Sequence, residues 1–310
     1  MHRLFRLSGA GAIVAFALGS IALAQDQPHF KSESELVVLH VMVTDRSGSY
    51  VSGLGADAFH VLDDSHPQTT RFFLNEDAPV TVGLLIDSSG SMRNVRDRVI
   101  AAAAEFVTSS NPQDEVFALV FNDDVQPVLS GQPFTSDPET LRNALATVFQ
   151  PAGRTALYDA VAHGLHYVAN GTSERRVLVV LSDGGDNASD VNLKDVMTLV
   201  QTSNTVIYSV ALDDPSDADA NPKRLRQFAD ASGGESFSPK NVDEVRSAFQ
   251  KIARDVRHSY TIGYEPANAT PRAGLHKIRV DVKSPDGRRL DVHSRTGYLK
   301  GSVDARPDAR

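Results

Sequence analysis

Near-continuous apolar runs alternate with amphipathic stretches between residues 78 and 256, and this alternation limits the possible folds more than any other feature. Apolar runs without polar alternation are typical of parallel strands that are covered on both faces. The stretches between them repeat apolar residues at spacings of three and four, as helices do. Strands are expected at 80–86, 116–121, 177–181 and 206–212, and helices at 95–107, 140–148, 156–169, 193–200, 223–231 and 242–256. The pattern predicts a doubly wound α/β domain over 78–256, with a mostly parallel sheet between two layers of helices.

Short strand-like runs flank this region, in an N-terminal segment at 30–77 and a C-terminal segment at 257–300. Each flank is too small to bury a core by itself. Because the ends of one domain usually lie close together, we hypothesise that the flanks combine into a small β-sandwich with the α/β domain inserted between them. Two separate β appendages are the alternative. Residues 301–310 are polar and are expected to form a disordered tail.

The first residues have the layout of a signal peptide. A short basic start is followed by an apolar stretch at 9–23 and by the small-x-small sequence Ala22-Leu23-Ala24. An uncleaved anchor is the alternative, but the apolar stretch is shorter than the roughly 20 residues that a spanning helix needs. We therefore expect residues 1–24 to be removed, leaving a secreted or periplasmic protein without a stable membrane anchor.

The absence of cysteine and the acidic charge exclude several kinds of function. With no cysteine in 310 residues, the chain has neither a disulfide framework nor a thiolate site, so an exported domain depends on its core or on a metal. The formal net charge of −8 argues against a nucleic acid as the main partner.

Polar side chains follow two of the predicted strands at the point where each ends. Asp87, Ser89 and Ser91 come after the strand at 80–86, and Asp183 comes after the strand at 177–181. Ligands of open α/β sheets bind at the carboxyl ends of the strands. Carboxylate and hydroxyl oxygens suit Mg²⁺, Mn²⁺ or Ca²⁺ better than zinc or copper. A helix N-cap also explains Asp-Ser-Ser-Gly-Ser taken alone, but a second Asp at a matching strand end favours a metal site.

These residues carry a specific resemblance. The sequence Asp87-Ser88-Ser89-Gly90-Ser91 after an apolar strand resembles the first motif, D-x-S-x-S, of von Willebrand factor A and integrin inserted domains. Residues 153–157 have the Gly-x-Thr-x-Leu form of the family's middle loop, and Ser182-Asp183-Gly184 resembles its last motif. All positions of the family's metal-ion-dependent adhesion site are filled, by Asp87, Ser89, Ser91, Thr155 and Asp183.

The resemblance implies both a cofactor and a way of binding. It implies that Ser89, Ser91 and Thr155 are direct or near-direct ligands of Mg²⁺ (or of Mn²⁺ or Ca²⁺), and that the two aspartates act mainly through bound waters. A protein partner would then offer an acidic residue to the ion, as in adhesion. Arg154 and Asp186 are candidates for the rim that contacts the partner.

The flanks are similar to those of secreted bacterial proteins that carry this domain, a resemblance that brings no known activity. It rests on patterns that include the acidic pair Asp63-Asp64, the run 260–264 and the closing sequence Arg295-Thr296-Gly297-Tyr298. Ser65 departs from the pattern, because a turn glycine is usual after the acidic pair.

Two classes of enzyme are alternatives, but we predict no catalytic activity. Mg²⁺-dependent phosphatases of the haloacid dehalogenase type also carry an Asp after the first strand, but they need a second Asp two residues later, where Ser89 stands. A serine hydrolase would need a G-x-S-x-G sequence around Ser89 or Ser91, and there is none. A structural interaction module with no bound metal is the other alternative.

Overall fold

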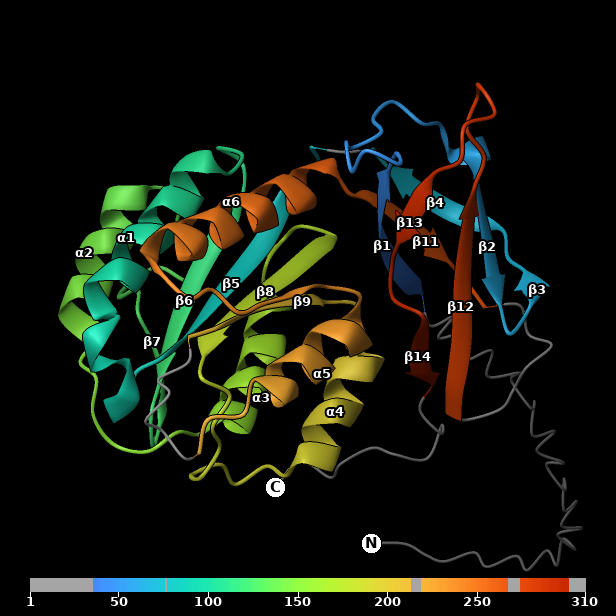
Figure 1. Cartoon of the computed structure of the whole chain (residues 1–310). Coiled ribbons are helices and arrows are strands. Elements are labelled where there is room, and N and C mark those ends of the chain that lie inside the picture. Colours follow the sequence, from blue (N-terminus) through green and yellow to red (C-terminus); the bar gives the residue numbers. More distant parts are fainter. Residues whose placement is uncertain (1–35, 76, 213–218, 267–273, 301–310) are drawn as a thin grey trace, which may run out of the picture. The chain divides into compact units, whose positions relative to one another are not determined.

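The computed structural model describes residues 36–75, 77–212, 219–266 and 274–300. The predicted signal peptide at 1–24 and the predicted tail at 301–310 lie outside these residues. A six-stranded sheet forms the centre of the α/β part (Figure 1). In sheet order, its strands are β10 (Ser236–Phe237), β9 (Val206–Ala211), β8 (Arg175–Ser182), β5 (Val80–Asp87), β6 (Glu115–Phe121) and β7 (Val125–Pro127). All neighbours are parallel except β6 and β7, so the predicted mostly parallel sheet is confirmed.

Helices cover both faces of this sheet, as the sequence predicted. One apolar core packs the sheet against α1 (Arg96–Ser109), α2 (Pro138–Val148) and α6 (Val242–His258). A second core lies on the other face, with α3 (Leu157–Val168), α4 (Leu193–Thr202) and α5 (Pro222–Ser232). Strand β5 serves both cores, because Leu84 points into the first and Leu85 into the second. Every residue of β5 is buried, which explains why its sequence has no polar alternation.

The flanking segments form two antiparallel sheets. The first has the order β13 (Asp291–His293), β1 (Val37–Thr44), β11 (Tyr260–Tyr264) and β4 (Thr70–Leu74). The second has the order β14 (Gly297–Lys300), β12 (Gly274–Val282), β2 (Phe59–Asp63) and β3 (His66–Pro67). The described residues also include two short 3₁₀ helices, η1 (Ala56–Ala58) and η2 (Gly90–Asn94).

Strands from the two ends of the chain pair with each other in both sheets. The N-terminal strand β1 pairs with β11 and β13, and β2 pairs with β12. The inward side chains of both sheets belong to one apolar core, which includes Leu39, Val61, Ile262 and Val280. The two flanks therefore share a sandwich core and are not separate appendages. The residue boundaries predicted from the sequence for each domain remain predictions.

A buried arginine joins the sandwich to the α/β part. Arg295 is 4% exposed, and its guanidinium donates to the carbonyl oxygens of Gln201 and Ser203, each at 2.8 Å. These carbonyls lie at the C-terminal end of α4, where backbone oxygens lack helical partners and favour a positive charge. Burial lowers the pKa of Arg295 to about 10. The arginine of the closing Arg-x-Gly-Tyr sequence therefore caps the C-terminal end of α4.

The shared sandwich core leads to a stability prediction. Ile262 is fully buried and pairs with Leu39. Replacing Ile262 with Ala is expected to lower the free energy of unfolding by about 2–5 kcal/mol, because buried methyl groups are lost and a cavity remains. Urea denaturation followed by circular dichroism measures this change. The control Arg279→Ala lies on an exposed position of β12 and should change stability by less than about 0.5 kcal/mol. Equal effects of the two substitutions would contradict a common core.

Candidate functional site

Three loops meet at the carboxyl edge of the central sheet. The first leaves β5 at Asp87 and enters η2, the second precedes α3 and carries Thr155, and the third follows β8 and begins with Asp183. Backbone hydrogen bonds fasten the second loop to its neighbours, since Ala152 N donates to Ser88 O at 2.8 Å and Asn187 N donates to Thr155 O at 3.0 Å. The structure thus brings together the loops that the motifs singled out.

Asp87 is fully buried where β5 ends. Its Oδ1 accepts a hydrogen bond from Ser89 N at 2.8 Å, and its Oδ2 accepts one from the Ser182 hydroxyl at 2.6 Å. Burial raises the pKa of Asp87 to about 6, because desolvation outweighs these hydrogen bonds and the nearby Asp183 adds repulsion. The carboxylate therefore lies where a positive charge would stabilise it.

The hydroxyls of Ser89 and Ser91 connect the first loop to Asp183. Their Oγ atoms are 3.1 Å apart, and Ser91 Oγ donates to Asp183 Oδ2 at 2.8 Å. The other oxygen of Asp183 accepts from Gly185 N at 2.8 Å, which fixes the carboxylate in the loop. The result is a continuous row of oxygen atoms between the ends of β5 and β8.

Thr155 lies between the same loops and is 6% exposed. Thr155 N donates to Asn187 Oδ1 at 2.9 Å, and Thr155 O accepts from the backbone of Asn187 and Ala188. These contacts hold the loop through the Thr155 backbone and do not use its hydroxyl.

The two rim candidates have partners of their own. Arg154 is exposed and pairs with Asp123, with Nε 2.8 Å from Oδ1. The Arg154 backbone and side chain hold the pKa of Asp123 below its usual range. Asp186 Oδ1 accepts from Ser189 Oγ at 2.5 Å and from Tyr158 N at 3.2 Å, so this carboxylate lies at the start of α3. Asp123 is a rim residue that the sequence did not reveal as such.

The donor set of this site fits a hard divalent cation. It combines two buried carboxylates with two serine hydroxyls and one threonine hydroxyl, all oxygen donors. Within the described part of the chain, the hydrogen bonds to Asp87 and Asp183 come from serine hydroxyls and backbone amides, not from Lys or Arg. Buried acidic oxygens without a cationic partner are costly, and Mg²⁺, Mn²⁺ or Ca²⁺ would offset that cost.

The sequence profile of the von Willebrand factor type A domain matches residues 82–255, more than half of the chain. The chain belongs to the von Willebrand factor type A family. Domains of this family typically mediate protein interaction or adhesion and are typically not enzymes. The matched region contains all three loops described above.

Individual relatives are distant. An uncharacterised protein of Borreliella burgdorferi is 22% identical over 182 residues, which are 57% of this chain and 52% of that protein, so the match spans about half of the relative's length. The solved von Willebrand factor type A structure from Catenulispora acidiphila is 13% identical and covers 88% of this chain and 76% of its own, with a TM-score of 0.50. An aerotolerance-related membrane protein from Bacteroides fragilis is 17% identical, covers 57% of this chain and 98% of its own, and has a TM-score of 0.46.

In the part of this von Willebrand factor type A chain that the structure describes, no helix combines the length and the apolar character needed to cross a membrane.

The raised pKa of Asp87 predicts how the stability of the metal-free protein depends on pH. With a pKa of about 6, Asp87 keeps its proton in the folded protein up to about pH 6, whereas an unfolded chain releases it near pH 3.8. Stability is therefore expected to fall as pH rises from about 4 to about 6, by at most about 3 kcal/mol from this group. Asp87→Asn should remove that part of the fall. Urea denaturation with EDTA at several pH values measures the difference, and parallel pH profiles of variant and wild type would contradict it.

Proposed function

We propose that this chain binds a protein partner through a divalent cation, as a metal-ion-dependent adhesion module. The ion is Mg²⁺, with Mn²⁺ or Ca²⁺ as substitutes, and its ligands are the hydroxyls of Ser89, Ser91 and Thr155. Asp87 and Asp183 hold the ion's waters. The observation that supports this proposal is the row of oxygen atoms from Ser89 through Ser91 to Asp183, next to the buried carboxylate of Asp87.

The charge of the ligands explains why such a site would bind a partner. Neutral hydroxyls contact the ion directly, while the carboxylates act across water, so the ion keeps part of its positive charge. It can then accept a carboxylate oxygen from an acidic residue of the partner. Arg154 at the rim favours the same acidic group, although its pairing with Asp123 limits how far it can reach.

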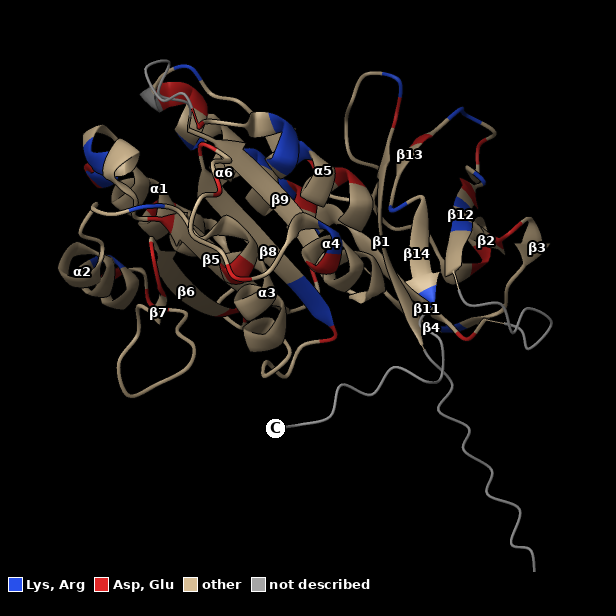
Figure 2. Ribbon diagram, turned by 90° about the horizontal axis from the view of Figure 1, so that it is seen from below, with Lys and Arg blue, Asp and Glu red and all other residues tan. Residues whose placement is uncertain are grey.

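The class of partner is proposed from the net charge, and the location is proposed from the N-terminal sequence. The protein has a net charge of −8, and its basic and acidic residues are interspersed along the ribbon (Figure 2). Both features disfavour a nucleic-acid partner. An exported location, secreted or periplasmic, is proposed from the signal-peptide layout of residues 1–24.

The geometry gives no support to a hydrolase. Ser89 and Ser91 contact each other and Asp183, and no histidine of the described residues hydrogen-bonds to either hydroxyl. A phosphatase would need a second acid at position 89 to protonate the leaving group, and a serine cannot supply it at neutral pH. Absence of turnover of p-nitrophenyl phosphate with Mg²⁺ is therefore expected.

Calorimetric titration of Mg²⁺ and Mn²⁺ into chelator-stripped mature protein tests the proposal. Wild type should bind about one ion with saturation, and Asp87→Ala should bind at least ~10-fold more weakly, because a carboxylate that orients the ion's waters is lost. Ser91→Ala should weaken binding in the same direction, because it removes a direct ligand. Asp230→Ala, an exposed acid of α5, is the charge-matched control and should bind like wild type.

The same variants test the partner. Capture of acidic proteins on immobilised wild type should require the ion and should be lost in Asp87→Ala. Mg²⁺ binding that is equal in Asp87→Ala and Asp230→Ala would show that the oxygen row is not the metal site.

A further inference from the structure

A second group of metal-ligating side chains lies in the β-sandwich. Asp63 and Asp64 lie where β2 turns into β3, and His276 lies on the neighbouring strand β12. His276 Nδ1 is 3.0 Å from Asp64 Oδ2 and 3.5 Å from Asp63 Oδ1. One ligand atom from each residue lies within 4.8 Å of the other two. None of these residues belongs to the three loops at the edge of the central sheet.

The two carboxylate oxygens of Asp63 differ in their hydrogen bonds. Its Oδ2 accepts from the hydroxyls of Tyr264 at 3.0 Å and Tyr298 at 2.9 Å. Its Oδ1 is buried, and no hydrogen-bond donor of the described residues reaches it. The side chain is 4% exposed, and Oδ1 faces His276 Nδ1. A buried carboxylate oxygen left in this state is costly, and a shared cation would remove the cost.

Asp64 is held in a similar way. Its Oδ1 accepts from Lys277 N at 2.9 Å, while its Oδ2 points to His276. Asp64 has φ 47° and Ser65 has φ 68°, so the turn keeps a left-handed backbone although Ser65 replaces the usual glycine. A two-residue hairpin turn between β2 and β3 requires a positive φ at both positions. The turn places Asp64 Oδ2 beside His276 Nδ1.

The third residue is fixed by an aromatic neighbour. The His276 ring stacks on Tyr298, with ring centres 5.1 Å apart and ring planes inclined by 22°. Tyr298 therefore orients both His276 and Asp63. Supporting contacts of this kind, which hold the ligands from outside, are typical of metal sites in proteins.

We propose that Asp63, Asp64 and His276 form a binding site for a divalent transition-metal ion of the Zn²⁺ type. Ligand atoms 3.0 and 3.5 Å apart can share an ion at the roughly 2.0–2.2 Å distances of Zn–N and Zn–O bonds. The imidazole nitrogen favours Zn²⁺ over Mg²⁺ and Ca²⁺. This preference separates the site chemically from the all-oxygen site at the edge of the central sheet.

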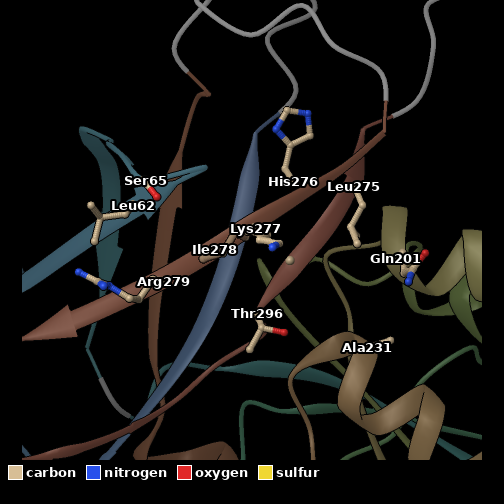
Figure 3. A pocket seen from close by; sticks show the side chains of 11 residues that line it. Leu62, Ser65, Gln201, Ala231, Leu275, His276, Lys277, Ile278, Arg279 and Thr296 are labelled. Atoms are coloured by element: carbon tan, nitrogen blue, oxygen red, sulfur yellow. The ribbon is translucent and has the colours of Figure 1, made fainter.

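The site is within reach of solvent. The Asp64 side chain is 37% exposed, whereas Asp63 and His276 are each 4% exposed. Ser65 and His276 also belong to the lining of a pocket of about 800 Å³ (Figure 3). An ion can therefore enter past Asp64, and three protein ligands leave a fourth position for water or for an acidic group.

Zn²⁺ titration against a chromophoric chelator tests the site, using Asp87→Ala protein so that the first site does not contribute. About one Zn²⁺ per chain is expected. Asp64→Asn and His276→Gln should each weaken binding by at least ~100-fold, because changes even outside the ligand shell cost about 10- to 100-fold. Asn tolerates the left-handed backbone at position 64, so Asp64→Asn should fold. Circular dichroism and melting curves of each variant verify this.

Asp281→Asn, an exposed acid on the same strand, is the matched control and should bind Zn²⁺ like the parent. Co²⁺ in place of Zn²⁺ adds a visible spectrum that should disappear in His276→Gln. Folded parent protein without saturable Zn²⁺ uptake would overturn the proposal and leave only a direct contact between His276 and the two acids. Uptake that persists in both Asp64→Asn and His276→Gln would overturn it as well.

Discussion

Burial of β5 on both faces is the constraint on which the rest of the molecule depends. The strand is paired on one side with β6 and on the other with β8, and helices cover it above and below. Apart from Thr81, whose hydroxyl donates to Glu115 at 2.7 Å, β5 carries no polar side chain before Asp87 at its end. Ile86 is level with Leu181, so Asp87 and Asp183 follow at nearly the same height on adjacent strands. The fold therefore concentrates acidic groups at one edge, where a bound cation would relieve their repulsion.

The long elements could be predicted from the sequence, because their side-chain periodicity records burial directly. The strand expected at 206–212 is β9 (Val206–Ala211), and the helix expected at 242–256 is α6 (Val242–His258). The short strands β3, β7, β10 and β14 were missed. They contain two to four residues each, too few for a period, and exist because a neighbouring strand offers hydrogen bonds.

The residues of the candidate sites also differ in how far the sequence alone could predict their contacts. Asp87, Ser89 and Ser91 lie within one short motif, so the sequence alone could group them, and their proximity to Asp183 followed from strand-end positions. The pairing of Arg154 with Asp123 spans 31 positions, and the contact of Asp64 with Lys277, next to His276, spans 213. No local pattern encodes such contacts, because they arise from how the sheets assemble.

The hydroxyl of Tyr264 in one sheet donates a hydrogen bond to Asp63 in the other. In a chain without cysteine, this hydrogen bond links the two layers.

The interleaving of the two chain ends has a consequence for how the protein is made. The bond from Leu54 N to the Tyr260 hydroxyl joins residues 206 positions apart, and most sandwich pairings are comparably distant. Synthesis from the N-terminus delivers β1 and β2 long before their partners β11 and β12. Until then, two apolar strands have open edges on which other chains can pair. Folding of the inserted α/β part would bring the late strands back to the early ones and shorten the effective loop that must close.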